Sequence, residues 1–343
     1  MIKDCENKLL KTIINHFEFG NFNEIDKLIN NLDSKNNELI YFLSIYYMHI
    51  GKYCISQKLL EKLISLNDSI KYRALLRLSV LYYINSNIRE CNRCLELIEN
   101  FNENLKEYSL RAYGNLILNL LSWRMNNPKF KMYFSPKSPK IYFIGDSHAL
   151  SGNGVLFNIE EVKLLGETKL IMGIQMSHLA FDKNNKYQSS ICKLINNIPK
   201  RSYIFFSIGE IDTRFEYGFI KKYGMDIRTL SKKIEWVVVR YLRFLAQFSN
   251  SFNIIISGVS RPSLKSMKVD EQLNLVRSEV IKITNSLLKE HSLISNFGYL
   301  DLYQFTTQVS EQNLSVYRLD SFHLSPEAYS DAFSNQLIDS PKL

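Results

Sequence analysis

Residues 141–148 read Ile-Tyr-Phe-Ile-Gly-Asp-Ser-His. Four β-branched or aromatic residues lead into a glycine, and polar residues follow at once. A short apolar run of this kind suits a strand that is buried on both faces of a parallel sheet. The serine that follows stands at a turn before a helix, where its backbone N–H can stabilise an anion. We therefore expect a buried strand that ends at a functional turn.

Further short apolar runs, typical of buried strands, follow at residues 169–173, 202–208, 252–257 and, more weakly, 298–302. Helical periodicity separates them and is clearest at about 226–248, 268–290 and 325–338. Strands that alternate with helices indicate a doubly wound, flavodoxin-like α/β domain, which we assign to residues 141–343. Ligand chemistry in such domains lies at the carboxyl ends of the strands.

The N-terminal part differs, because residues 1–127 show helical periodicity and lack proline. Turn positions at Gly20, Gly51 and Ser86 recur at a spacing close to the roughly 34 residues of tetratricopeptide repeats. Each turn is followed two positions later by a large apolar residue: Phe22, Tyr53 and Ile88. The segment resembles three degenerate tetratricopeptide repeats, and an irregular helical bundle is the alternative. Residues 128–140, with three prolines and four lysines, are expected to form a linker.

Two polar motifs stand at opposite ends of the α/β region. Ser147 follows the first strand, and Asp320 and His323 lie near the end of the chain. A serine hydroxyl is a poor nucleophile at neutral pH and needs a base, which His323 can supply. Asp320 can fix the tautomer of the imidazole and offset the charge that it gains. The alternative is that Ser147 only begins a helix, with its neighbours as turn residues.

Gly145-Asp146-Ser147 together with Asp320-x-x-His323 resembles the SGNH (GDSL-like) hydrolase and acyltransferase superfamily, over roughly residues 139–340. The resemblance implies that Ser147 is the nucleophile, that Asp320 and His323 complete a catalytic triad, and that Gly173 and the Ser147 N–H form the oxyanion hole. The third family block reads GxND, whereas residues 209–212 read Gly-Glu-Ile-Asp. Ile211 thus stands where the asparagine donor would be, and Arg214 and Asn153 are both open as substitutes.

Other polar residues near the strand ends are candidates for binding substrate: His148, Glu210, Asp212, Arg214 and Arg261. Each also has a structural alternative. His148 can pack in the turn, and Glu210, Asp212 and Arg214 can satisfy one another as ion pairs. His178, after the second predicted strand, is a weaker candidate. No metal-ligand spacing and no phosphate-binding loop occur in the sequence.

Composition bounds the remaining possibilities. The net charge of +9 is spread along the 343 residues without a basic block, so we expect no nucleic-acid partner. No apolar run reaches the roughly 20 residues of a membrane span, and no signal peptide is evident. The five cysteines suit reduced thiols and a cytoplasmic protein, and Cys91 and Cys94 fall at buried helix positions rather than at a zinc or redox site.

The function expected from these features is serine-dependent acyl-ester chemistry. The resemblance favours an esterase or O-acetyltransferase that acts on a carbohydrate, in modification of a bacterial surface polysaccharide. No cofactor is expected, apart from acetyl-CoA as acyl donor if the enzyme is a transferase. The alternative is a scaffold whose helical repeats bind a peptide or another protein, with an inactive SGNH-like domain.

Overall fold

The computed structural model describes residues 2–335, except for positions 31, 33, 67, 68, 99–106, 131, 133–136, 160 and 264–269. Contacts divide the chain into two units. One unit is Met1–Ser122 with Lys183–Ile198, and the other is Trp123–Asp182 with Pro199–Leu343. Much of the predicted linker, at 131 and 133–136, lies outside the described residues, as do the predicted helix ends at 268–269 and 336–338.

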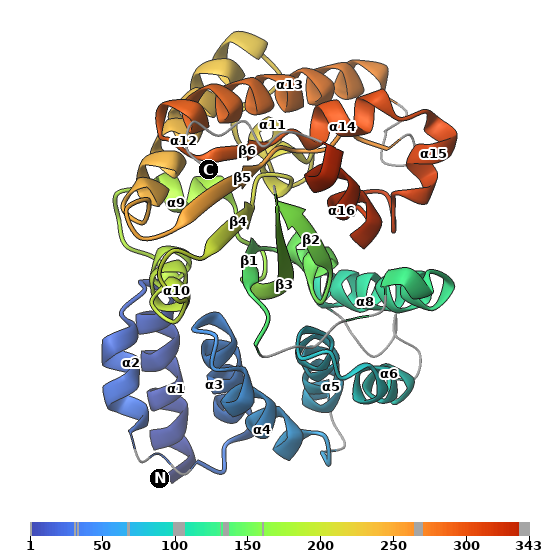
Figure 1. The fold of residues 1–343 in the computed structure, drawn as a ribbon. Coiled ribbons are helices and arrows are strands. Elements are labelled where there is room, and N and C mark those ends of the chain that lie inside the picture. The colour runs from blue at the N-terminus through green and yellow to red at the C-terminus, as the bar shows by residue number, and fades with distance from the viewer. Residues whose placement is uncertain are drawn as a thin grey trace. The chain divides into compact units, whose positions relative to one another are not determined.

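The first unit is helical throughout its described residues (Figure 1). The pairs α1–α2, α3–α4 and α5–α6 are each joined by a tight turn and pack against one another. Its helices are α1 (Ile2–Glu18), α2 (Phe22–Ile29), α3 (Asn37–His49), α4 (Tyr53–Leu63), α5 (Ser69–Ile84), α6 (Ile88–Glu96), α10 (Lys186–Ile195) and most of α8 (Tyr108–Asn126).

The three predicted turn positions share one backbone conformation. Gly20, Gly51 and Ser86 all have left-handed φ values, of 70°, 75° and 60°. In the first turn, the Gly20 N–H donates to the carbonyl oxygen of Phe17 and the Asn21 N–H donates to that of His16, at 2.9 and 2.8 Å. The other two turns repeat this pair of bonds, which ends a helix in a Schellman motif. The next helix then begins each time at the predicted large apolar residue.

Cys91 and Cys94 lie buried on α6 with free thiols, as predicted. Burial raises the pKa of each thiol to about 12, so both stay protonated at neutral pH. On α4, the buried Ser56 donates a hydrogen bond of 2.8 Å to the carbonyl oxygen of Ser44 on α3. Small side chains at Ser56 and Cys91 thus let neighbouring helices approach closely.

Helix α10 belongs to the helical unit although its sequence lies within the α/β region. Ser189 on α10 donates to the carbonyl oxygen of Gly20, at 2.8 Å. Ser190 contacts the buried His49 of α3, and a Cβ at Gly51 would lie only 2.7 Å from Leu194. The predicted domain boundaries, at residues 127 and 141, had placed this helix in the α/β domain.

The second unit is built on a six-stranded sheet of the order β2-β3-β1-β4-β5-β6 (Figure 1). The strands are β1 (Lys140–Gly145), β2 (Leu156–Ile159), β3 (Val162–Leu170), β4 (Tyr203–Ser207), β5 (Asn253–Ser257) and β6 (Gly298–Leu300). All neighbouring strands pair in parallel except β2, which pairs antiparallel with β3 at the edge. The chain therefore reverses its direction of travel across the sheet between β1 and β4.

The predicted strands at 141–144, 202–208 and 252–257 are confirmed, and 298–302 is confirmed as the shorter β6. The strand predicted at 169–173 is wrong in its position, because β3 ends at Leu170, and β2 was not predicted at all. The physical reason is that the edge strand β2 and the first residues of β3 carry solvent-facing polar residues, such as Asn158 and Lys163, which interrupt the apolar pattern of a fully buried strand.

Both faces of the sheet are buried. On one face Phe143 and Phe205 pack against Tyr329 and Phe333 of α16 (Pro326–Asn335), and Phe305 of α14 (Leu302–Gln308) joins them. Side chains of opposite alternation on the same strands are buried as well. The other helices of the unit are α9 (Met176–Ala180), α11 (Phe219–Tyr223), α12 (Ile227–Ala246), α13 (Glu271–Ile294) and α15 (Glu311–Val316), with short 3₁₀ turns η1 (Pro128–Phe130), η2 (Ser147–Gly152) and η3 (Ile211–Thr213).

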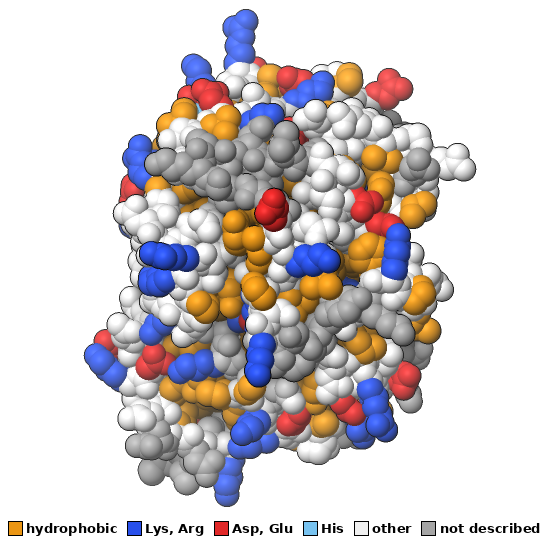
Figure 2. All heavy atoms as spheres, viewed as in Figure 1, with side chains coloured by type: hydrophobic (Ala, Val, Ile, Leu, Met, Phe, Trp, Pro, Cys, Tyr) orange, Lys and Arg blue, Asp and Glu red, His pale blue; other side chains and the backbone are white. Residues whose placement is uncertain are grey.

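On the face drawn in Figure 2, Lys and Arg side chains lie singly among acidic and uncharged ones. No described helix is both long and apolar enough to cross a bilayer.

Candidate active site

Ser147 stands where the central strand β1 ends and the turn η2 begins. Asp146 precedes it, and the Asp146 carboxylate accepts a hydrogen bond of 3.0 Å from the His148 N–H. This side-chain cap fixes the first residues of η2, so the turn places the Ser147 side chain beyond the carboxyl edge of the sheet. Because the chain reverses between β1 and β4, a crevice is expected at this edge.

The structure brings the three predicted catalytic residues together. The Ser147 Oγ lies 2.8 Å from His323 Nε2, and His323 Nδ1 lies 2.7 Å from Asp320 Oδ2. The predicted contacts of the triad are therefore present, from residues 176 positions apart in the chain. His323 is 7% exposed, so its ring is held largely away from water.

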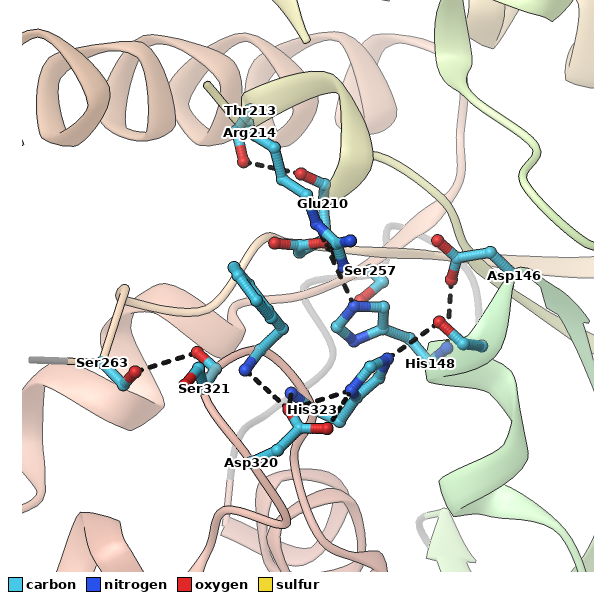
Figure 3. Close-up of polar contacts among 12 residues, drawn as sticks. Asp146, His148, Glu210, Thr213, Arg214, Ser257, Ser263, Asp320, Ser321 and His323 are labelled. Atoms are coloured by element: carbon cyan, nitrogen blue, oxygen red, sulfur yellow. Dashed lines mark hydrogen bonds and ion pairs between the residues drawn. The ribbon is translucent and has the colours of Figure 1, made fainter. Parts of the chain in front are cut away.

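The loop that carries Asp320 and His323 is shaped by the Asp320 carboxylate itself. Its Oδ1 accepts hydrogen bonds from the N–H groups of Phe322 and His323, at 2.7 and 2.8 Å. An isolated bridge between Arg318 and Leu324 closes the base of the loop. The spacing of three residues thus lets one carboxylate both fold the loop and contact the imidazole (Figure 3).

The electrostatics of the pair suit a general base. Burial raises the pKa of the Asp320 carboxyl, but the hydrogen bonds and charge of His323 outweigh it, so the net shift is downward and Asp320 is ionised. Burial and the neighbouring His148 lower the pKa of His323, against the opposite effect of Asp320. A neutral His323 whose Nδ1–H faces a carboxylate leaves Nε2 free to accept the Ser147 proton.

His148 lies directly against this base. The ring centroids of His148 and His323 are 4.5 Å apart, with an angle of 34° between the planes. The His148 Nε2 lies 3.4 Å from Glu210 Oε2, and His148 is 7% exposed. The structure therefore places His148 within the cluster, where both the substrate-contact and the packing interpretation are open to test.

Glu210 and Arg214 form a buried ion pair next to His148. The Arg214 Nε donates to Glu210 Oε2 at 2.6 Å, and the guanidinium lies 4.4 Å from the ring centroid of Phe322. Burial opposes ionisation of Glu210, but Arg214 and His148 outweigh it and hold its pKa below the ordinary range. The predicted ion pairing is present for these two residues, which lie beside His148 (Figure 3).

Asp212 does not join that cluster. Its carboxylate accepts hydrogen bonds from the N–H groups of Met176 and Ser177, at 2.8 and 3.4 Å, in the first turn of α9. Burial raises the pKa of Asp212 to about 6, and the hydrogen bonds oppose that rise. These contacts give Asp212 a structural role as the anchor of α9, and no described contact joins it to Ser147, His323 or Asp320.

The predicted oxyanion donors differ in their surroundings. Gly173 is an exposed residue with a left-handed φ of 72°, in the turn after β3. Asn153 is buried, and its Oδ1 accepts the Thr168 N–H of β3 at 3.1 Å, which commits that oxygen to the sheet. Of the two substitutes for the missing asparagine, Arg214 is the one that lies in the site.

Arg261 and His178 have backbone or capping contacts. The Arg261 N–H donates to Thr306 Oγ1 at 2.9 Å, and its carbonyl oxygen accepts from Arg318. His178 Nδ1 accepts the Gln175 N–H at 3.1 Å, as part of the cap of α9.

Sequence reasoning missed Arg277 and Phe322. Arg277 projects from α13 to within 3.8 Å of Glu210, and its guanidinium lies 5.8 Å from the ring centroid of Phe322. Arg277 is a helix residue far from every motif, so no local signal marks it. Phe322 lies inside the Asp320-x-x-His323 motif, where an aromatic residue at a strand-end loop was a usable signal.

A scan against models of protein families and a search of curated proteins each found no match for this chain.

Proposed function

We propose that this chain is a serine-dependent acyl-ester enzyme, an esterase or an O-acetyltransferase. The observation that carries the proposal is the continuous chain of contacts from Ser147 Oγ through His323 to the Asp320 carboxylate, at 2.8 and 2.7 Å. This is the arrangement that activates a serine hydroxyl in unrelated folds. The strand order, which for the five parallel strands is that of flavodoxin-like doubly wound sheets, supports an SGNH-type domain.

In the proposed reaction, Ser147 Oγ attacks the carbonyl carbon of an ester while His323 Nε2 takes the hydroxyl proton. Asp320 offsets the charge that the imidazole gains. When the tetrahedral intermediate collapses, the bond between the acyl carbon and the leaving oxygen breaks, and His323 returns the proton to that oxygen. The acyl group is then bound to Ser147 until water or a second hydroxyl, deprotonated by His323, releases it.

Stabilisation of the oxyanion is assigned to the backbone N–H groups of Ser147 and Gly173, as the family resemblance implies. Ile211 cannot donate a hydrogen bond from its side chain. The positive charge of Arg214, held beside the triad by Glu210, is the described group best able to compensate electrostatically.

The acceptor is proposed to be a carbohydrate hydroxyl, with acetyl-CoA as acyl donor in the transferase case. This part rests on the resemblance of the first and third motifs to enzymes of bacterial surface-polysaccharide modification. A cytoplasmic location is proposed as well, supported by the free thiols of Cys54, Cys91, Cys94 and Cys192.

The alternative function is a scaffold whose tetratricopeptide-like helices bind a protein partner while the α/β unit is inactive. The repeated turns at Gly20, Gly51 and Ser86 support a repeat architecture, which commonly presents a binding surface. The assembled contacts of Ser147, His323 and Asp320 favour the enzyme, because a scaffold has no need of them.

Hydrolysis of p-nitrophenyl acetate by the full chain and by Ser147→Ala separates the two functions. The enzyme proposal predicts turnover that depends on Ser147, and the scaffold alternative predicts none above background. Ser190→Ala is a matched control, since Ser190 also lies next to a buried histidine, in the other unit. Repeating the assay with acetyl-CoA and a glycan acceptor distinguishes transfer from hydrolysis.

A further inference from the structure

The two buried histidines of the site lie ring against ring, His148 directly after the proposed nucleophile and His323 as its base. Their rings are 4.5 Å apart and tilted by 34°. Two imidazolium ions at this distance in a buried site repel each other strongly, so the pair favours binding one proton before a second. Which ring holds the first proton then decides whether the base is ready to act.

Charged groups from several elements face the pair. Around His148 lie Asp146 at the end of β1, Glu210 after β4, and Arg214 behind Glu210. His148 and Glu210 line a small cavity of about 20 Å³, and Tyr329 of α16 lines it as well. Burial raises the pKa of the Tyr329 phenol, so this side chain stays neutral. Arg277 of α13 approaches the other oxygen of Glu210. His323 faces His148, Asp320 and Arg214.

The contacts divide the two roles. His323 has both nitrogens committed to the triad, Nε2 to Ser147 and Nδ1 to Asp320. His148 instead points Nε2 at the carboxylate of Glu210, 3.4 Å away, and the Asp146 carboxylate accepts a hydrogen bond from the His148 N–H. A cation at His148 therefore has two carboxylates beside it, whereas a cation at His323 has one carboxylate and a second histidine.

We propose that His148 is a positioning residue for the proposed acyl-ester reaction: it holds the first proton of the histidine pair, and its positive charge keeps His323 neutral and ready to accept the Ser147 proton in mildly acidic solution. The proposal deepens the proposed function and rests on it for its consequence in catalysis, although the proton order of the pair is a property of the folded protein alone.

The directions of the pKa values agree with this order. Burial lowers the pKa of His148, but Asp146 and Glu210 outweigh it, so the net pKa is raised. Burial and His148 together lower the pKa of His323. Removing the His148 charge should therefore raise the pKa of His323 and make the base protonate at higher pH.

The direct test is a nuclear magnetic resonance titration of protein labelled with ¹⁵N-histidine, in which the chain has only six histidines to assign. We expect the signal of His148 to titrate at higher pH than that of His323 in the unaltered protein. In His148→Gln, the midpoint of His323 should move to higher pH. His291→Gln, the same substitution on α13, should leave it unchanged. Titration of His323 before His148 as the pH falls, or an unmoved His323 midpoint in folded His148→Gln, would overturn the proposal.

The order of titration in the unaltered protein decides the matter even if His148→Gln does not fold. The catalytic consequence is read from the pH profile of kcat/KM with p-nitrophenyl acetate, whose acidic limb should move to higher pH in His148→Gln. An even loss of activity at every pH would mean that His148 only supports the structure. If the unaltered protein shows no turnover at all, the proposed function fails, while the titration still decides the state of the histidine pair.

Discussion

Among the described residues, two serine–histidine pairs, one in each unit, differ in what surrounds them. In the α/β unit, Ser147 Oγ lies 2.8 Å from His323 Nε2. In the helical unit, Ser190 Oγ lies 3.0 Å from His49 Nδ1. Both histidines are almost fully buried, at 7% and 8% exposure. Proximity of a serine to a histidine is therefore not what marks a site.

The second partner of each residue makes the difference. His323 has the Asp320 carboxylate on its other nitrogen, whereas the charges that act on His49 are the cations Lys186 and Arg77. Ser190 lies within α10 and donates its proton to the carbonyl oxygen of Lys186 at 2.7 Å. Ser147 stands at the end of a strand, where substrate can approach. A carboxylate and an accessible edge turn the same two side chains into a candidate nucleophile and base.

The largest expected contrast between the pairs is in turnover. Ser147→Ala should reduce kcat/KM for p-nitrophenyl acetate by roughly 10⁴-fold or more, because the acyl-enzyme cannot form. Ser190→Ala should change it less than about twofold, as expected of a substitution outside the reacting groups. An equal loss of kcat/KM in the two variants would mean that Ser147 is no more a nucleophile than Ser190.

The second-largest expected effect is the loss of activity on removing the Asp320 carboxylate, which contacts His323. In Asp320→Asn, the amide can stabilise the wrong tautomer of His323, so kcat should fall by about 10²- to 10⁴-fold. The near-ultraviolet circular dichroism spectrum should be unchanged. A loss below tenfold, in a folded variant, would show that Asp320 only shapes its loop.

The His49–Ser190 pair of the helical unit should instead affect how the free energy of unfolding depends on pH. Burial and nearby cations lower the pKa of His49 to about 3, while an unfolded histidine titrates near 6.5. Between pH 6.5 and 3, His49 therefore binds a proton in the unfolded state but not in the folded state. The free energy of unfolding falls as the pH falls through this range. The slope is at most about 1.4 kcal/mol per pH unit.

Urea unfolding of the unaltered protein and His49→Gln at pH 7, 6 and 5 measures this effect. The variant should be less stable at pH 7, because His49 also packs edge-on against Phe17, at 5.0 Å between ring centroids. The difference between the two proteins should narrow as the pH falls. A difference that stays constant with pH would mean that His49 binds its proton equally well in the folded and unfolded states.

The smallest expected effect is the stability contributed by each serine. Ser147→Ala should cost at most about 1 kcal/mol of unfolding free energy, since the side chain is only partly buried at a strand end. Ser190→Ala should cost more, about 1–3 kcal/mol, because it leaves a buried nitrogen of His49 without its partner. Chemical denaturation at pH 7 compares them, and the reverse ranking would count against the assigned roles.

Local patterns in the sequence were sufficient for the helix turns and the triad. Gly20, Gly51 and Ser86 were found because small turn residues recur at a repeat-like spacing, each followed two positions later by a large apolar residue. Ser147 was found because it directly follows a buried strand, in the Gly145-Asp146-Ser147 motif. His323 was found because it ends the Asp320-x-x-His323 motif just before a predicted helix start.

Interactions that depend on tertiary packing could not be read in the same way. Helix α10 has an amphipathic pattern that is equally suited to either unit, so its place beside His49 was hidden. The edge strand β2 lacks an apolar run, since one side faces solvent. The ring contact of His148 with His323 and the approach of Arg277 to Glu210 join distant parts of the chain that no spacing connects.

Covalent labelling tests the central claim most directly. The intact protein is treated with a fluorophosphonate, which reacts with activated serine hydroxyls, and the modified peptides are identified by mass spectrometry. The account predicts one adduct on Ser147, lost in His323→Gln, and no adduct on Ser190. An unmodified Ser147, under conditions in which a known serine esterase reacts fully, or equal modification of both serines, would contradict it.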